Sequence, residues 1–104
     1  MSSYFHALAD PTRRALLTQL LYADLSVTRL GEQHDISLPA VSKHIRVLEQ
    51  AGLVSRLRQG SIHMIALRTE PLETLVTWLT GFTSSSRPAQ LDRLAALLDD
   101  RDNA

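Results

Sequence analysis

The stretch of sequence that decides the fold is Ser37–Val54, which reads SLPAVSKHIRVLEQAGLV. Its apolar residues recur at the three- and four-residue spacing of a helix that buries one face. They are Val41, Ile45 and Leu48. Ser37 is a typical N-cap residue, and Gly52 is a typical residue just beyond a helix C-terminus. The stretch therefore predicts a helix over 38–50 with one apolar face and one polar face.

A second, shorter helix is expected just before this one. It begins with Ser26 as its N-cap and runs to about His34. A tight turn at 36–39 then joins the two helices. Two helices joined by such a turn form a helix-turn-helix, in which the second helix lies in the major groove of DNA. We therefore expect the helix over 38–50 to be the reading helix.

The pattern of side chains changes after Gly52. Residues 53–58 and 61–68 carry β-branched and aliphatic side chains on either side of Gln59-Gly60, which is a turn pair. We therefore expect a β-hairpin here, in the position of a wing beside the reading helix.

Helices are expected on both sides of this central unit. Asp10-Pro11 is a typical helix start, so 11–22 is predicted to be helical, with a shorter helix before it. The helical period returns over 71–82 and again over 91–98. The order of elements is therefore two helices, the helix-turn-helix, the hairpin and two more helices.

Two segments near the C-terminus are expected to be irregular. The run 81–88 contains three serines and a proline, which should weaken or break the helix, and 99–104 should be a frayed tail. The fold class is mainly α with a small β-hairpin, a winged helix-turn-helix of order α-α-α-α-β-β-α-α. One domain is expected over 1–104, with a DNA-reading part at 26–68 and a dimerisation part at 3–22 and 70–99.

Charge is distributed unevenly along the 104 residues, although the formal net charge is zero. Between Ser37 and Arg68 there are five basic residues and one acid. From Thr69 to Ala104 six acids outnumber three basic residues. The basic segment coincides with the predicted helix-turn-helix and wing, which is where phosphate contacts are needed.

Candidate DNA contacts lie on the polar side of the reading helix and at the hairpin tip. Lys43 and Arg46 carry donors for phosphate or guanine edges, and Leu38 carries an apolar side chain for a thymine methyl group. Any one of these charges, taken alone, is more often an ordinary solvated charge, so their joint placement carries the prediction. The candidates are Ser37, Leu38, Pro39, Ser42, Lys43, His44, Arg46, Arg56, Arg58, Gln59 and Ser61.

Two stretches resemble the ArsR family of bacterial repressors. They are Phe5–Arg14, which reads FHALADPTRR, and Ser37–Val54, and the likeness extends over 4–67. The resemblance implies repression of transcription by occupation of a pseudo-palindromic operator in double-stranded DNA. It also implies a homodimer built from the first and last helices. The residues that would form this interface are Tyr4, Phe5, Leu8, Leu72, Leu75, Trp78, Leu79 and Phe82.

Members of that family often release DNA when a metal binds, and the corresponding ligands are missing here. The chain has no cysteine, so 27–34 lacks the family's thiolate site. No histidine follows His63, so the family's C-terminal zinc site lacks its imidazoles. His6, His34 and His44 share no close ligand spacing with it or with one another. We expect neither metal nor cofactor, as in the metal-independent autorepressors.

Other functional classes receive less support. The sequence has no nucleophile elbow, no phosphate-binding glycine loop and no metal-ligand pair, so we expect no enzyme activity. It has no apolar run long enough for a membrane span and no secretory signal, so a cytoplasmic protein without membrane contact is expected. The main alternative is a winged-helix module that binds protein and not DNA. The zero net charge favours that alternative slightly, whereas Lys43 and Arg46 argue against it.

Overall fold

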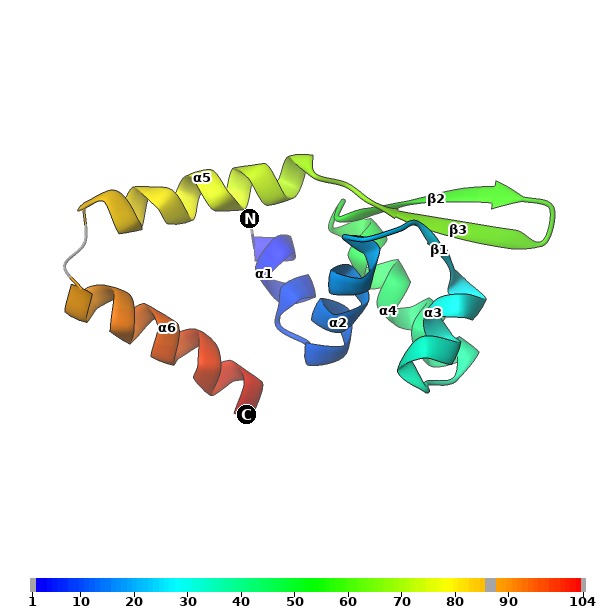
Figure 1. Cartoon of the computed structure of the whole chain (residues 1–104), viewed down its shortest axis with the longest axis horizontal. Coiled ribbons are helices and arrows are strands. Elements are labelled where there is room, and N and C mark those ends of the chain that lie inside the picture. The colour runs from blue at the N-terminus through cyan, green and yellow to red at the C-terminus, as the bar shows by residue number, and fades with distance from the viewer. Residues whose placement is uncertain (1, 86–87, 104) are drawn as a thin grey trace.

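The computed structural model describes residues 2–85 and 88–103, with the backbone alone at 84, 85, 91 and 98–103. Most of the chain is helical, and a small three-stranded sheet packs beside the helix-turn-helix (Figure 1). This confirms the predicted fold class. The elements are α1 (Ser2–Leu8), α2 (Pro11–Leu20), β1 (Leu25–Ser26), α3 (Val27–His34), α4 (Leu38–Gln50), β2 (Val54–Gln59), β3 (Ile62–Leu67), α5 (Glu70–Ser85) and α6 (Pro88–Asn103).

The sheet has one strand more than the sequence predicts. Strands β2 and β3 form the expected antiparallel hairpin, and β1 pairs with the other edge of β3, so the order is β1-β3-β2. Leu25 pairs with Ile65, and Ser26 pairs with Met64. A strand of two residues shows no alternation in sequence, so only the free edge of β3 reveals it. The predicted two-stranded hairpin is therefore corrected to a three-stranded sheet.

The core lies where α2, α3, α4 and the sheet meet. Its fully buried side chains are Leu16, Leu30, Val41, Ile45, Leu48, Leu53 and Ile65. Each buried leucine or isoleucine side chain contributes roughly 1.5–3 kcal/mol relative to an exposed one. The three core residues of α4 therefore determine which side of that helix faces away from the protein.

Both helices of the helix-turn-helix end in the same backbone motif. After α4, Gly52 has φ +77° and Leu53 N donates to Leu48 O over 3.0 Å. After α3, Asp35 has φ 50° and Ile36 N donates to Gly31 O over 3.2 Å. These bonds satisfy the last carbonyl groups of each helix. The turn between α3 and α4 is thus closed by local hydrogen bonds.

Helices α3 and α4 approach each other closely at Gly31. A Cβ atom at this position would lie 3.2 Å from Val41 Cγ2 and 3.3 Å from Ile36 O. Val41 is fully buried and Ile36 O is backbone, so neither moves easily. A glycine at this position therefore sets the spacing of the two helices.

Three helix ends differ from the sequence-based predictions. Helix α2 ends at Leu20, two residues before the predicted end at Tyr22. Helix α5 continues through Gly81 to Ser85, because one glycine costs only about 1 kcal/mol, and the hydroxyl groups of Thr80 and Thr83 donate to helix carbonyls within it. Ser86 and Arg87 lie outside the described residues.

The predicted frayed tail is also helical. Helix α6 extends to Asn103, since no glycine or proline interrupts 89–103. None of the helices in the described part of the chain is long and apolar enough to cross a membrane.

Candidate nucleic-acid interface

Helix α4 has two sharply different sides. Val41, Ile45 and Leu48 have no exposed surface, whereas Lys43 and Arg46 are exposed. The buried face fixes the helix on the core and leaves the two cations on the open side. An open cationic side is what a helix needs in order to enter a DNA groove.

The N-terminal end of α4 is capped and exposed. Ser37 Oγ accepts a hydrogen bond from Ala40 N over 3.3 Å, and Pro39 is the second residue of the helix. Leu38 is 50% exposed, and Ser42 is half-buried beside it. The structure therefore brings the predicted residues of this end together on one surface.

The wing projects from the body as a two-stranded ribbon (Figure 1). Its turn is Gly60-Ser61, and Gly60 has φ +63°, a conformation that glycine adopts without strain. Arg58, Gln59 and Ser61 are all exposed at this tip. The three predicted wing contacts thus lie together, and Gln59 belongs to β2 and not to the turn.

A cleft of about 420 Å³ separates the wing from the start of α4. The start of α3 forms its third side. Ser26, Thr28 and Ile62 line it and were not predicted as site residues. The full lining is Ser26, Val27, Thr28, Leu38, Ser42, Arg56, Ser61, Ile62 and His63. The reading helix and the wing therefore border one shared hollow.

Arg56 is bound within the protein. Its Nε and Nη2 atoms donate to Glu49 Oε1 over 3.2 and 2.7 Å, and its Nη1 atom lies 2.9 Å from His63 Nδ1. Arg56 therefore links the C-terminal end of α4 to the wing. Neither Glu49 nor His63 was predicted as a site residue. The close approach of Glu49 and Arg56 depends on how the sheet packs against α4, which no local pattern encodes.

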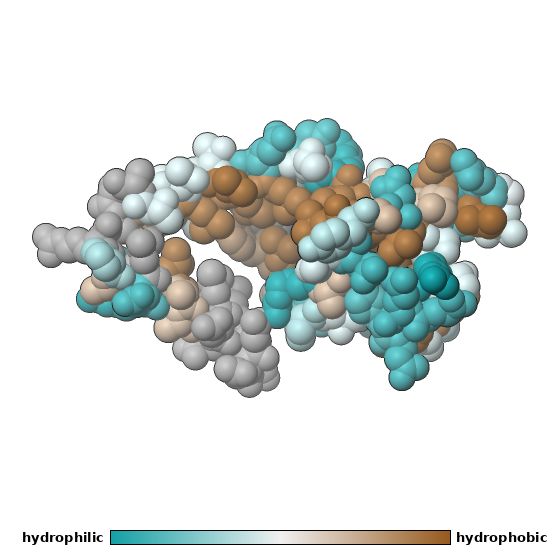
Figure 2. Space-filling model, viewed as in Figure 1, coloured by the Kyte–Doolittle hydropathy of each residue, from teal (hydrophilic) through white to brown (hydrophobic). Residues whose placement is uncertain are grey.

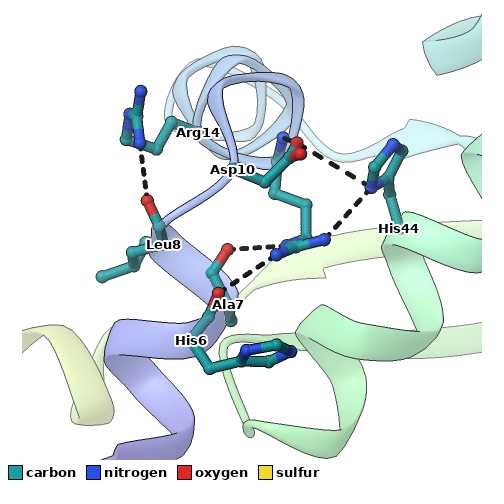
Figure 3. Close-up of polar contacts among 7 residues, drawn as sticks. His6, Ala7, Leu8, Asp10, Arg14 and His44 are labelled. Carbon is teal, nitrogen blue, oxygen red and sulfur yellow. Dashed lines mark hydrogen bonds and ion pairs between the residues drawn. The ribbon is translucent and has the colours of Figure 1, made fainter. Parts of the chain in front are cut away.

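His44 turns toward the N-terminal helices and away from the open side of α4. Its Nδ1 atom lies 3.4 Å from Arg13 Nη1 and 3.9 Å from Asp10 Oδ2 (Figure 3). Its side chain is 22% exposed. His44 therefore connects the reading helix to the start of α2, a place different from that of the other predicted DNA contacts.

Arg13 and Arg14 complete the end of α1. Arg13 Nε donates to Ala7 O over 2.7 Å, and its Nη2 donates to His6 O over 3.0 Å. Arg14 Nη1 donates to Leu8 O over 2.8 Å (Figure 3). The two guanidinium groups satisfy carbonyls that the short helix leaves open. These arginines were not predicted as site residues, although they belong to the FHALADPTRR stretch.

Asp10 caps α2 by accepting a hydrogen bond from Arg13 N over 2.9 Å. Burial of the Asp10 carboxylate opposes its charge. The hydrogen bond from the Arg13 backbone, the positive charge of Arg13 and the nearby His44 side chain outweigh burial, so the pKa of Asp10 is lowered. The carboxylate therefore stabilises the start of α2 in its ionised form.

The residues predicted for a dimer interface gather along α1 and α5. The ring centroids of Phe5 and Trp78 lie 5.5 Å apart, and those of Trp78 and Phe82 lie 4.8 Å apart. Trp78 and Phe82 remain 39% and 44% exposed, and Figure 2 shows apolar surface along this side of the molecule. Leu75 is buried, whereas Tyr4, Leu8, Leu72 and Leu79 are half-buried.

Among the described residues, no three side chains of His, Cys, Asp or Glu come together in a group that could hold a metal ion. The four histidines lie in different surroundings. His44 and His63 each contact an arginine, and His34 Nε2 is buried with no hydrogen-bond partner among the residues that the structure describes.

A capped, cationic reading helix beside a β-hairpin defines the class of winged helix-turn-helix DNA-binding proteins. Residues 8–56 match the family model described as a helix-turn-helix domain. The chain is 34% identical to the transcriptional repressor SdpR of Bacillus subtilis (strain 168) over 82 residues, which cover 79% of this chain and 91% of SdpR. It is 38% identical over 78 residues to the HTH-type transcriptional regulator Rv2034 of Mycobacterium tuberculosis (strain ATCC 25618 / H37Rv), covering 75% of this chain and 73% of Rv2034.

A solved structure gives the same result. The crystal structure of the ArsR family transcriptional regulator RHA00566 superposes with a TM-score of 0.76 at 36% identity, and covers 83% of this chain and 97% of that one. The chain belongs to the ArsR family of transcriptional regulators. It is a DNA-binding regulator and not an enzyme.

Proposed function

We propose that this protein is a sequence-specific repressor that binds a pseudo-palindromic operator as a homodimer, without a metal effector. One observation carries the proposal. The polar side of α4 is open along its N-terminal half, while the opposite side is fully buried against the core. A helix held in this way presents fixed side chains to base edges.

The proposed contacts divide into two groups. Lys43 and Arg46 bind base edges or phosphates in the major groove, assisted by the exposed residues at the helix start, Ser37, Leu38, Pro39 and Ser42. Arg58, Gln59 and Ser61 contact the DNA backbone from the wing. The predicted contacts Arg56 and His44 act as positioning residues, because both already hold protein groups.

Two copies are needed to read a palindrome. The exposed rings of Trp78 and Phe82, with Phe5 from α1, form the centre of the proposed interface. Tyr4, Leu8, Leu72 and Leu79 extend it along α1 and α5. We propose that this interface holds the two reading helices about 34 Å apart, one turn of DNA. Occupation of the operator then excludes the polymerase.

The salt dependence of binding tests this proposal. Fragments retained from the host genome supply an operator, and its affinity is measured by fluorescence anisotropy between 50 and 200 mM salt. A dimer that neutralises six or more phosphates should lose about a thousandfold in affinity over this range. A flat salt profile, or no retained fragment, contradicts the proposal and favours a protein-binding module.

A further inference from the structure

The reading helix carries the single lysine of the chain. The sequence contains ten arginines and one lysine, and that lysine is Lys43. An arginine guanidinium stays protonated, whereas a lysine amine can lose its proton and react with acyl donors. The one side-chain amine of the protein therefore lies on the open side of α4.

The amine of Lys43 has no acid beside it. Residues 39–47 contain neither aspartate nor glutamate, so no helix neighbour three or four positions away can pair with it. The carboxylate nearest in sequence, that of Glu49, accepts hydrogen bonds from Arg56 instead. Lys43 is exposed and takes part in no ion pair among the residues that the structure describes. Its amine is therefore accessible to reagents in the solvent.

A second positive charge stands next to this amine. Arg46 is three positions further along α4 and is also exposed. Side chains at this spacing are neighbours on a helix, so the two cations form one positive surface. Such a surface raises the local concentration of small anions. An acyl phosphate is an anion of this kind, and its carbonyl carbon is open to attack by an amine.

We propose that Lys43 is an acylation site, and that its modification by an acyl phosphate releases the protein from its operator. This proposal rests on the proposed function. The unprotonated Nζ of Lys43 attacks the carbonyl carbon, and a carbon–nitrogen bond forms. The carbon–oxygen bond to phosphate breaks, the phosphate leaves with the bonding electrons, and the proton lost from nitrogen passes to water. The product is an uncharged amide, so the open side of α4 loses one of its two cations.

Acylation and operator binding compete for the same amine. When α4 lies in the major groove, the DNA covers Lys43 and excludes the acyl donor. When Lys43 is acylated, its contact to a phosphate or a guanine edge is lost. The modification therefore acts on free protein and keeps it from rebinding.

The experiment uses acetyl phosphate as the probe. The protein is incubated with it at low salt, with and without a saturating operator fragment, and peptide mass mapping separates adducts on Lys43 from those on the α-amino group. The matched control is K43R/R93K, which has the same charge and the same number of lysines. Its amine lies on α6 at an exposed position outside the DNA-reading part.

Lys43 should react at least about threefold faster than the lysine of the control variant, because two cations attract the donor. Operator should slow the reaction at Lys43 and leave the rate at position 93 unchanged. Equal rates at the two positions, or no protection of Lys43 by operator, would overturn the proposed site.

Operator affinity then reports the consequence. Protein acetylated on Lys43 should bind about tenfold or more weakly, whereas K43R/R93K should bind within about twofold of its own untreated form after the same incubation. Unchanged affinity after acetylation of Lys43 would overturn the regulatory role alone. Failure of the unmodified protein to bind any operator fragment would instead contradict the proposed function.

Discussion

Helices α4 and α6 are both amphipathic, but their apolar side chains are buried to different degrees. The apolar side of α4 is fully buried in its own core, so its polar side is free to face a ligand. The apolar side of α6 leaves Leu97 more than half exposed. The core that holds the reading helix α4 is therefore formed within one chain.

The largest expected contrast concerns stability. Leu48→Ala removes a fully buried side chain of α4 and should lower the free energy of unfolding by about 2–5 kcal/mol. Leu97→Ala should have a much smaller effect at any protein concentration, because the Leu97 side chain is 57% exposed. Chemical denaturation at two protein concentrations checks both. A large, concentration-independent loss for Leu97→Ala would remove the contrast.

A smaller loss of stability is expected from substitutions at the contact between α4 and the wing. Replacing Arg56 or Glu49 by Ala should each lower stability by about 0.5–1 kcal/mol, because the pair is partly exposed. The double variant should lose little more than either single one. The same cycle measured on operator affinity reports the role of Arg56. Additive losses of affinity would instead identify Arg56 as a direct DNA contact.

The carboxylate at the start of α2 should make the stability of the protein modestly dependent on acid pH. Folding lowers the pKa of Asp10, so its stabilisation is present above the unfolded value of 3.8 and is lost as the pH falls through the folded pKa. Asp10→Asn keeps the N-cap acceptor but removes the ionisation. Its stability should therefore fall less than that of the parent chain in this acid range, as measured by denaturation. Parallel pH profiles would contradict the role of the carboxylate.

Metal ions are expected to have no effect on operator affinity. Zinc, cadmium or arsenite should change operator affinity by less than about twofold in a gel-shift assay, because the chain has no thiolate and the histidines at 44 and 63 already contact arginines. Release of DNA at micromolar metal would contradict this prediction and show that DNA binding responds to metal.

The bounds of a helix or strand can be predicted best where residues next to them in the sequence determine the backbone conformation. The bounds of α4 follow from Ser37 and Gly52, which act on the backbone of their own helix, so the prediction matches residue by residue. Strand β1 was not predicted, because a strand of two residues is too short to show alternation of apolar and polar side chains. The wing turn was misplaced by one residue, since Gln59 continues the ladder to Ile62.

The polar contacts of His44 and Arg56 could not be predicted from the sequence, because their partners lie on other elements of the fold. His44 was assigned to the DNA side from its residue type, whereas its partner Arg13 lies 31 positions away in the chain. Arg56 was predicted from its charge and strand position, but the nearby carboxylate of Glu49 became visible only when the sheet was packed on α4. Exposure on α4 followed from helical period, and so Lys43 and Arg46 could be predicted as open.

The central claim is that the polar side of α4 meets base pairs. The most direct measurement compares operator affinity for K43A/R46A with that of R93A/R101A, a control that loses the same charge on α6, outside the DNA-reading part at 26–68. We expect the first variant to bind more than about a hundredfold more weakly, with unchanged self-association, and the control to bind within about fivefold of the parent chain. Equal affinities of the two variants would contradict the account.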